Sequence, residues 1–200
     1  MSISAAEVKA LRERTGQGMM ECKRALEEAG GDADKAVEVL RKKGLATAEK
    51  KAGRAAAQGR IHSYIHHNGR LGVLLEVNCE TDFAANNEQF LAFLNNLCLQ
   101  ICAAAPLAVT REGVPEDLVE TEKHIARDQV EGTKPDHIIE KIVEGKLNKW
   151  YAQRVLLEQP YVKDDQRTVQ DLLTEQIATI GENVIIQRFA RFEVGETEAD

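Results

Sequence analysis

Aromatic residues are scarce in this chain of 200 residues. Phe, Trp and Tyr together make up 4% of it, with a single Trp. Proteins that bind single-stranded nucleic acid stack bases on rows of aromatic rings, so this composition argues against that function. The formal net charge of −7 argues the same way, because contacts with phosphates need a cationic surface. We therefore expect no direct binding of nucleic acid.

Long hydrophobic segments are missing as well. No apolar run approaches the ~20 residues that are needed to span a bilayer. Residues 1–4 lead into a charged amphipathic segment without the apolar core of a signal peptide. We therefore expect a cytoplasmic protein that does not bind membranes.

The sequence also lacks the motifs of common enzymes and nucleotide-binding loops. His62, His66 and His67 cluster around one predicted turn, and no carboxylate partner is placed beside them by the sequence. Solvated or core-edge histidines are the alternative to a metal or catalytic role. We predict no enzymatic activity and no cofactor.

Four cysteines are too few for a disulfide framework in a chain of this length. Cys98 and Cys102 are four residues apart in an apolar run and so share one helix face. Two ligands without a nearby histidine do not complete a metal site. We predict small buried apolar side chains.

Charge is divided unevenly along the chain. Residues 1–60 carry 13 Lys and Arg against 9 Asp and Glu, a net charge of +4, and the remainder carries a net charge of −11. Such asymmetry suggests two modules. We predict a helical domain over residues 1–45, a basic Ala-rich linker over 46–60, a core domain over 61–194 and an acidic tail over 195–200.

The first module is predicted to contain three helices. A capping box of Ser4 and Glu7 begins the first helix. The second helix spans residues 19–29. The third begins after Asp32 and is expected to end at Gly44.

The second module is predicted to be an α+β domain with about three antiparallel strands covered by helices. Residues 60–66 and 71–77 alternate in polarity around Asn68-Gly69, which is typical of a hairpin. Helices are expected after Asn86, over residues 115–130, after Pro135 and after Thr168. Residues 184–192 form the last strand.

Two segments contain apolar residues whose positions in the sequence indicate exposure, and this suggests that they contact a partner protein. In residues 11–26, Met19 and Met20 are adjacent, so either one faces outward or both fill gaps in a small bundle. In residues 76–83, Phe83 follows Asp82 in a polar loop. Its ring either folds back into the core or projects as a wedge.

These segments resemble the signatures of the elongation factor Ts family, the guanine-nucleotide exchange factors of elongation factor Tu. Residues 11–26 match the N-terminal signature of the family, residues 76–86 match the second, and residues 134–147 and 157–164 look like its C-terminal region. The likeness covers nearly all 200 residues in the same order. Ala84 stands where the family usually has valine, which should weaken local packing slightly. The chain is similar to short members with a single core module.

The resemblance implies a fold and a mechanism. It implies a three-helix, ubiquitin-associated-like N-terminal domain followed by the α+β core. The N-terminal domain would dock on the nucleotide-binding domain of elongation factor Tu through Val8, Leu11, Arg12, Met19 and Met20. Thr81, Asp82, Phe83 and Ala84 would disturb the magnesium and phosphate site so that GDP leaves.

Two further expectations follow from the same residues. Short members of the family are thought to dimerise through the core sheet, here by edge pairing of residues 184–192, although a covered edge would serve a monomer equally well. The alternative function is a ubiquitin-associated-like binding module for a ribosome-associated or nascent-chain partner, which the basic first 60 residues favour.

Overall fold

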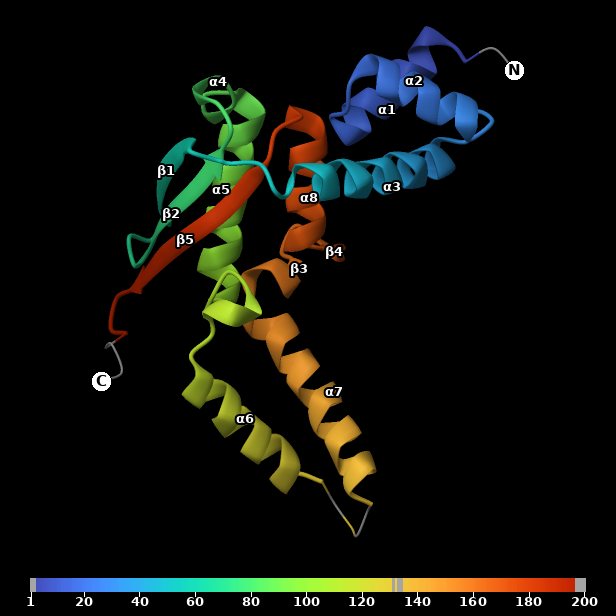
Figure 1. Cartoon of the computed structure of the whole chain (residues 1–200). Coiled ribbons are helices and arrows are strands. Elements are labelled where there is room, and N and C mark those ends of the chain that lie inside the picture. Colours follow the sequence, from blue (N-terminus) through green and yellow to red (C-terminus); the bar gives the residue numbers. More distant parts are fainter. Residues whose placement is uncertain (1–2, 131, 133–134, 197–200) are drawn as a thin grey trace. The chain divides into compact units, whose positions relative to one another are not determined.

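Helices and one small sheet make up the chain in this computed structural model, which describes residues 3–130, 132 and 135–196 (Figure 1). The residues group into two units by their contacts. The first unit combines the residues up to Arg60 with Asn78–Leu91 and Asp171–Ile185, and the second contains Ile61–Val77, Ala92–Gln170 and the residues from Ile186. The α+β fold class is confirmed.

Three helices form the N-terminal part of the first unit: α1 (Ala5–Thr15), α2 (Met19–Glu28) and α3 (Ala33–Lys51). The predicted capping box is present, with the backbone N–H of Ser4 donating to the Glu7 carboxylate at 2.7 Å and the Ser4 hydroxyl accepting from Glu7 N at 3.2 Å. The buried core of this bundle consists of Val8, Leu11, Cys22, Ala25, Leu26, Ala36 and Leu40.

The predicted end of the third helix at Gly44 is wrong. Helix α3 continues through Gly44 to Lys51, so it runs into the predicted linker. Gly44 is buried, and a Cβ built on it would lie 3.4 Å from the Cβ of Ala178. Glycine at this position therefore allows two helices to approach closely.

The main sheet has three strands in the order β1 (Gln58–Ile65), β2 (Leu71–Cys79) and β5 (Val184–Glu193) (Figure 1). Asn68 and Gly69 form the β1–β2 turn as predicted, and Gly69 adopts a φ of +67°. Alternate residues of β2 are buried, including Val73 and Leu75, whereas Leu74 is exposed on the other face. One face of the sheet therefore faces a core and the other faces solvent.

Helix α5 (Glu88–Ala104) supplies much of the buried apolar surface. It begins slightly later than predicted, because Asn87 rather than Asn86 accepts the hydrogen bond from Gln89 N at 2.8 Å. Cys98 and Cys102 lie on its buried side, as predicted. Burial raises the pKa of the Cys98 thiol to about 12.

Helices α6 (Glu116–Asp128) and α7 (Asp136–Arg154) form a hairpin within the second unit (Figure 1). A bidentate ion pair between Arg111 and Glu158 lies near its base, with the guanidinium 4.5 Å from the centre of the Tyr151 ring. A second small sheet of β3 (Pro160–Tyr161) and β4 (Asp164–Thr168) is not predicted from the sequence.

The last helix, α8 (Val169–Ile180), ends at Gly181 as predicted, and Gly181 has a φ of +78°. Over the described residues, no helix is long and apolar enough to cross a membrane. Lys134 and residues 197–200 of the predicted tail lie outside the described residues.

Candidate functional site

The ring of Phe83 projects into solvent from a short helix. Helix α4 (Asp82–Ala85) begins directly after Thr81, whose hydroxyl accepts a hydrogen bond from Ala84 N at 3.2 Å. Phe83 is 85% exposed, whereas Ala84 and Ala85 are buried. The sequence left two alternatives for Phe83, a ring that folds back into the core and a ring that projects. In the structure the ring projects. Asp82 is exposed beside it.

The carboxylate of Glu182 holds the chain just before Phe83. It accepts hydrogen bonds from the backbone N–H groups of Glu80 at 3.1 Å and Thr81 at 2.9 Å, and from the Thr81 hydroxyl at 2.6 Å. Carboxylates form stronger hydrogen bonds than neutral acceptors. Three donors on one carboxylate therefore fix the start of α4.

Glu80 completes the connection in the opposite direction. Its carboxylate accepts from Asn183 N at 2.7 Å and lies 3.5 Å from the Arg54 guanidinium. The hydrogen bond from Asn183, and then the positive charges of Arg54 and Lys51, lower the pKa of Glu80. The Asn183 side chain is buried and donates to the carbonyl oxygen of Arg54 at 2.7 Å.

Glu182 and Asn183 are functional candidates that the sequence does not predict. They stand between the end of α8 and the start of β5, about 100 residues from Thr81. No local pattern marks a carboxylate that will accept from a distant backbone, so only the folded chain brings these residues together. The resulting arrangement is an exposed apolar ring on a firmly held base, which suits insertion between elements of another protein.

The N-terminal candidates divide into two groups. Val8 is 6% exposed and Leu11 is 2% exposed, so they belong to the core of the bundle and are shielded from direct contact with a partner. Met19 and Met20 are 43% and 59% exposed, and Arg12 is exposed as well. Both methionines thus face outward, contrary to the idea that they fill gaps.

Gln17 anchors the turn between α1 and α2. Its side-chain amide donates to the Thr179 hydroxyl at 2.8 Å, within the first unit. The exposed methionines at the start of α2 and the loop that carries Phe83 therefore belong to the same unit.

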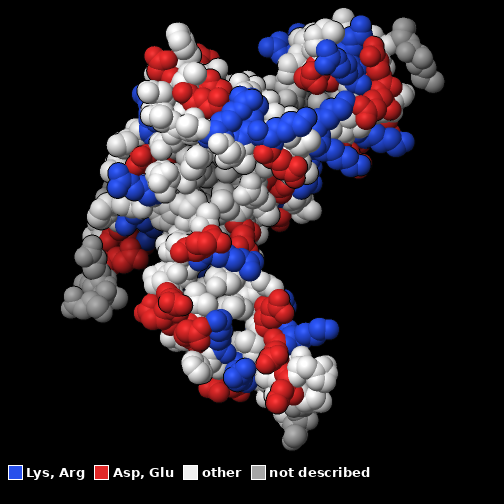
Figure 2. Space-filling view, viewed as in Figure 1, with Lys and Arg blue, Asp and Glu red and all other residues white. Residues whose placement is uncertain are grey.

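Basic side chains gather along α3 (Figure 2). Several of them have acidic or carbonyl partners within the first unit. Arg41 pairs with Asp171 at 2.8 Å and Lys43 with Glu28 at 2.6 Å, and Lys51 donates to the carbonyl oxygen of Gly181. Some of the positive charges in residues 1–60 therefore form ion pairs and hydrogen bonds within the protein, which weakens the argument that they form a ribosome-binding surface.

The histidine cluster makes contacts of a structural kind. Tyr64 Oη lies 3.1 Å from His66 Nδ1, and the His66 and His67 rings are 4.2 Å apart. Within the part of the chain that the structure describes, no group of three or more His, Cys, Asp or Glu side chains is arranged to hold a metal ion.

Known proteins resemble this chain over nearly its whole length. The family model described as Elongation factor TS matches residues 44–196. Elongation factor Ts of Moorella thermoacetica is 57% identical over 196 residues, which cover 97% of this chain and 96% of that protein. Elongation factor Ts of Geobacter metallireducens is 58% identical over 197 residues, covering 98% of this chain and 91% of that protein.

A third relative, elongation factor Ts of Coprothermobacter proteolyticus, is 57% identical over 197 residues. That match covers 98% of this chain and the full length of the relative, so it includes the N-terminal helices that precede the matched family region. The chain therefore belongs to the elongation factor Ts family and is a translation elongation factor.

Proposed function

We propose that this protein is a guanine-nucleotide exchange factor that binds elongation factor Tu with GDP and promotes release of the GDP, so that GTP can load. The observation that carries the proposal is the Phe83 ring, 85% exposed on a base that Glu182 holds. Membership of the elongation factor Ts family supports the identity of the partner.

Phe83 acts as the wedge in this mechanism. Insertion of the ring between helices of the GTPase contributes about 1.5–3 kcal/mol from burial of its apolar surface. Asp82 enters beside it, near the switch region. The displacement disturbs the magnesium and phosphate site, which lowers the affinity for GDP.

The N-terminal bundle supplies a second contact. Met19 and Met20 present flexible, polarizable side chains at the start of α2, and Arg12 adds a positive charge. These three residues dock on the nucleotide-binding domain. Val8 and Leu11 contribute indirectly, because they pack the core that holds the surface in shape.

The energetics require no acid, base or nucleophile in the factor. An exchange factor must bind the nucleotide-free GTPase more tightly than the GDP-bound form, and the same coupling lets GDP or GTP expel the factor. On this account the protein is not an enzyme, requires no cofactor and acts in the cytoplasm, where it makes no direct contact with nucleic acid or membrane.

We also propose that the predicted order of a helical domain, a linker and a core domain serves this function. The three-helix domain and two stretches of the core belong to one unit, and α3 forms the first part of the linker as a continuous helix. The Phe83 loop then works together with the bundle, because both belong to the first unit.

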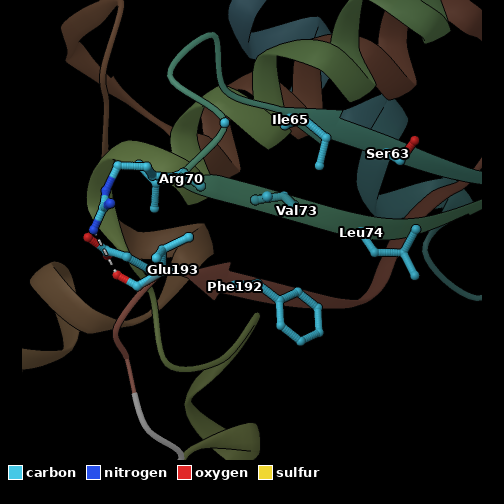
Figure 3. A pocket seen from close by; sticks show the side chains of 11 residues that line it. Ser63, Ile65, Arg70, Val73, Leu74, Phe192 and Glu193 are labelled. Atoms are coloured by element: carbon cyan, nitrogen blue, oxygen red, sulfur yellow. Dashed lines mark hydrogen bonds between the residues drawn. The ribbon is translucent and has the colours of Figure 1, made fainter.

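Self-association through the core sheet is a further part of the proposal. Strand β5 is at the edge of the sheet order, beyond β2. The solvent face of the sheet carries exposed Ile65, Leu74 and Phe192, which line an open hollow of about 450 Å³ (Figure 3). Burying this face against a second copy would stabilise a dimer by the hydrophobic effect. A contact through the face would bury more apolar surface than edge pairing of β5 alone.

A nucleotide-release assay tests the main proposal. Elongation factor Tu loaded with a fluorescent GDP is mixed with excess unlabelled GDP, with and without this protein. We expect the protein to accelerate release by orders of magnitude. Release at the spontaneous rate, together with capture of ribosomes or nascent polypeptide by the same protein, would favour the alternative binding module instead.

A further inference from the structure

We propose that Glu182 is a positioning residue for nucleotide exchange, because its carboxylate orients Thr81 and, through Thr81, the Phe83 ring. This inference rests on the proposed function and deepens it. It concerns a residue that no motif in the sequence marks.

The direction of the hydrogen bonds makes Thr81 a relay. Oε1 of Glu182 is an acceptor, so the Thr81 hydroxyl must donate its proton to it over 2.6 Å. The lone pairs of that hydroxyl are then free to accept from Ala84 N at 3.2 Å. Glu182 thus fixes the rotamer of Thr81 that caps α4.

The direction of the Phe83 ring depends on this relay, because the ring itself makes little contact with the rest of the chain. The ring is 85% exposed, so its direction follows from the backbone of α4. That helix has only four residues, Asp82–Ala85, and is too short to be stable without its cap. Loosening Thr81 would let the ring sample directions that do not fit the partner, and each binding event would then bear the cost of ordering the loop.

Glu80 has a different task from Glu182. The Glu80 carboxylate accepts from the backbone of Asn183, so it holds the segment that carries Glu182. Oε2 of Glu182 accepts from the backbone N–H groups of Glu80 and Thr81, so it holds the segment that carries Phe83. Of the two carboxylates, Glu182 therefore acts directly on the segment that carries the wedge.

The test combines Glu182→Gln, Thr81→Val and the double variant. Glutamine keeps the size of the side chain but replaces one acceptor oxygen by a donor, and valine keeps the shape of threonine but removes the hydroxyl. The rate of fluorescent GDP release from elongation factor Tu is measured at a saturating concentration of the factor. The concentration that gives half of the maximal effect is measured separately.

We expect each single variant to release GDP roughly tenfold more slowly at saturation, because small errors in placement have large effects on rate. The half-saturating concentration should change by less than about threefold, since the Met19 and Met20 surface still docks. The double variant should be within about twofold of the slower single variant, because the two residues act through one relay. Thr81→Ser, which keeps the hydroxyl, should restore most of the rate.

Glu158→Gln is the matched control. The Glu158 carboxylate accepts two hydrogen bonds from Arg111 in the second unit, and this substitution should leave the release rate unchanged. Glu182→Gln at the wild-type rate, or a double variant whose losses multiply, would overturn the inference. If Glu182→Gln fails to fold, a wild-type rate for Thr81→Val overturns it equally.

These outcomes are distinct from failure of the proposed function. If the wild-type protein does not accelerate GDP release, the exchange proposal itself is wrong. If the wild-type protein does so and loss of the Phe83 ring slows it, but the relay variants do not, only the role of Glu182 is wrong.

Discussion

Phe83 and Ala84 are adjacent in the chain, yet Phe83 is 85% exposed and Ala84 is 6% exposed. The first turn of α4 thus buries its small residue and presents its large one. Folded proteins usually bury the larger apolar residue and expose the smaller one, since burial of a phenylalanine stabilises far more than burial of an alanine. The Phe83 ring therefore contributes little to stability, which agrees with the role in binding that we propose for it.

Replacement of the wedge should separate exchange from folding. Phe83→Ala should slow release of GDP at least tenfold in the fluorescent assay. The melting temperature should stay close to that of the wild type, because the ring makes little contact with the rest of the chain. Ile125→Ala, at an exposed position on α6, is a suitable control and should leave release unchanged. Equal rates for Phe83→Ala and the wild type would show that the wedge account is wrong.

The two groups of N-terminal residues should respond differently to substitution. Met20→Ala should weaken binding to elongation factor Tu about tenfold, as expected for an interface residue, with little loss of stability. Leu11→Ala should destabilise the three-helix bundle by about 2–5 kcal/mol, because it leaves a cavity. Isothermal titration and thermal unfolding measure the two effects. A large loss of stability in Met20→Ala would contradict its exposed position.

A charge placed on the open face of the sheet should prevent self-association. Phe192 is 65% exposed in the hollow of about 450 Å³, and Phe192→Glu would bury a carboxylate in the proposed dimer. Light scattering should give about twice the chain mass of 22.2 kDa for the wild type and the chain mass for the variant. A wild-type protein that is monomeric at high concentration would end the dimer proposal.

The cysteines should be unreactive in the native protein. All four are buried, and burial raises the pKa of Cys98 to about 12. Since the thiolate is the reactive form, an aromatic disulfide reagent at pH 8 should modify Cys98 far more slowly than a free thiol. In denaturant all four thiols should react quickly. Fast modification of Cys98 in the folded protein would indicate that α5 opens readily.

Acid should loosen the connection between Glu80 and Asn183. The pKa of Glu80 is lowered from its ordinary value of 4.5, so the folded state favours the charged carboxylate. Its contribution to stability is full above the ordinary pKa and is lost as the pH falls through the lowered one. Thermal unfolding between pH 7 and pH 3 should show a smaller decrease for Glu80→Gln than for the wild type below pH 4.5. Parallel curves would show that Glu80 does not contribute.

Local patterns in the sequence determined most of the elements. The capping box of Ser4 and Glu7, the turn at Asn68 and Gly69 and the stop at Gly181 each depend on residues within a few positions of one another, so their physics is visible in a short window. The predicted helix end at Gly44 is wrong, because the reason for glycine at this position is not local. A nearby helix, and not a left-handed conformation, favours glycine there.

Local patterns in the sequence predicted only part of the candidate site. Met19, Met20 and Phe83 stand in unusual settings in the sequence. No local pattern determines whether they are exposed, because burial depends on how distant parts of the chain pack. Only the tertiary structure decided that Val8 and Leu11 are core, that both methionines are outside and that Phe83 projects. It also decided that Glu182 holds Thr81 from about 100 residues away. A hydrogen bond needs two atoms within about 3 Å, and no spacing along the sequence encodes that proximity.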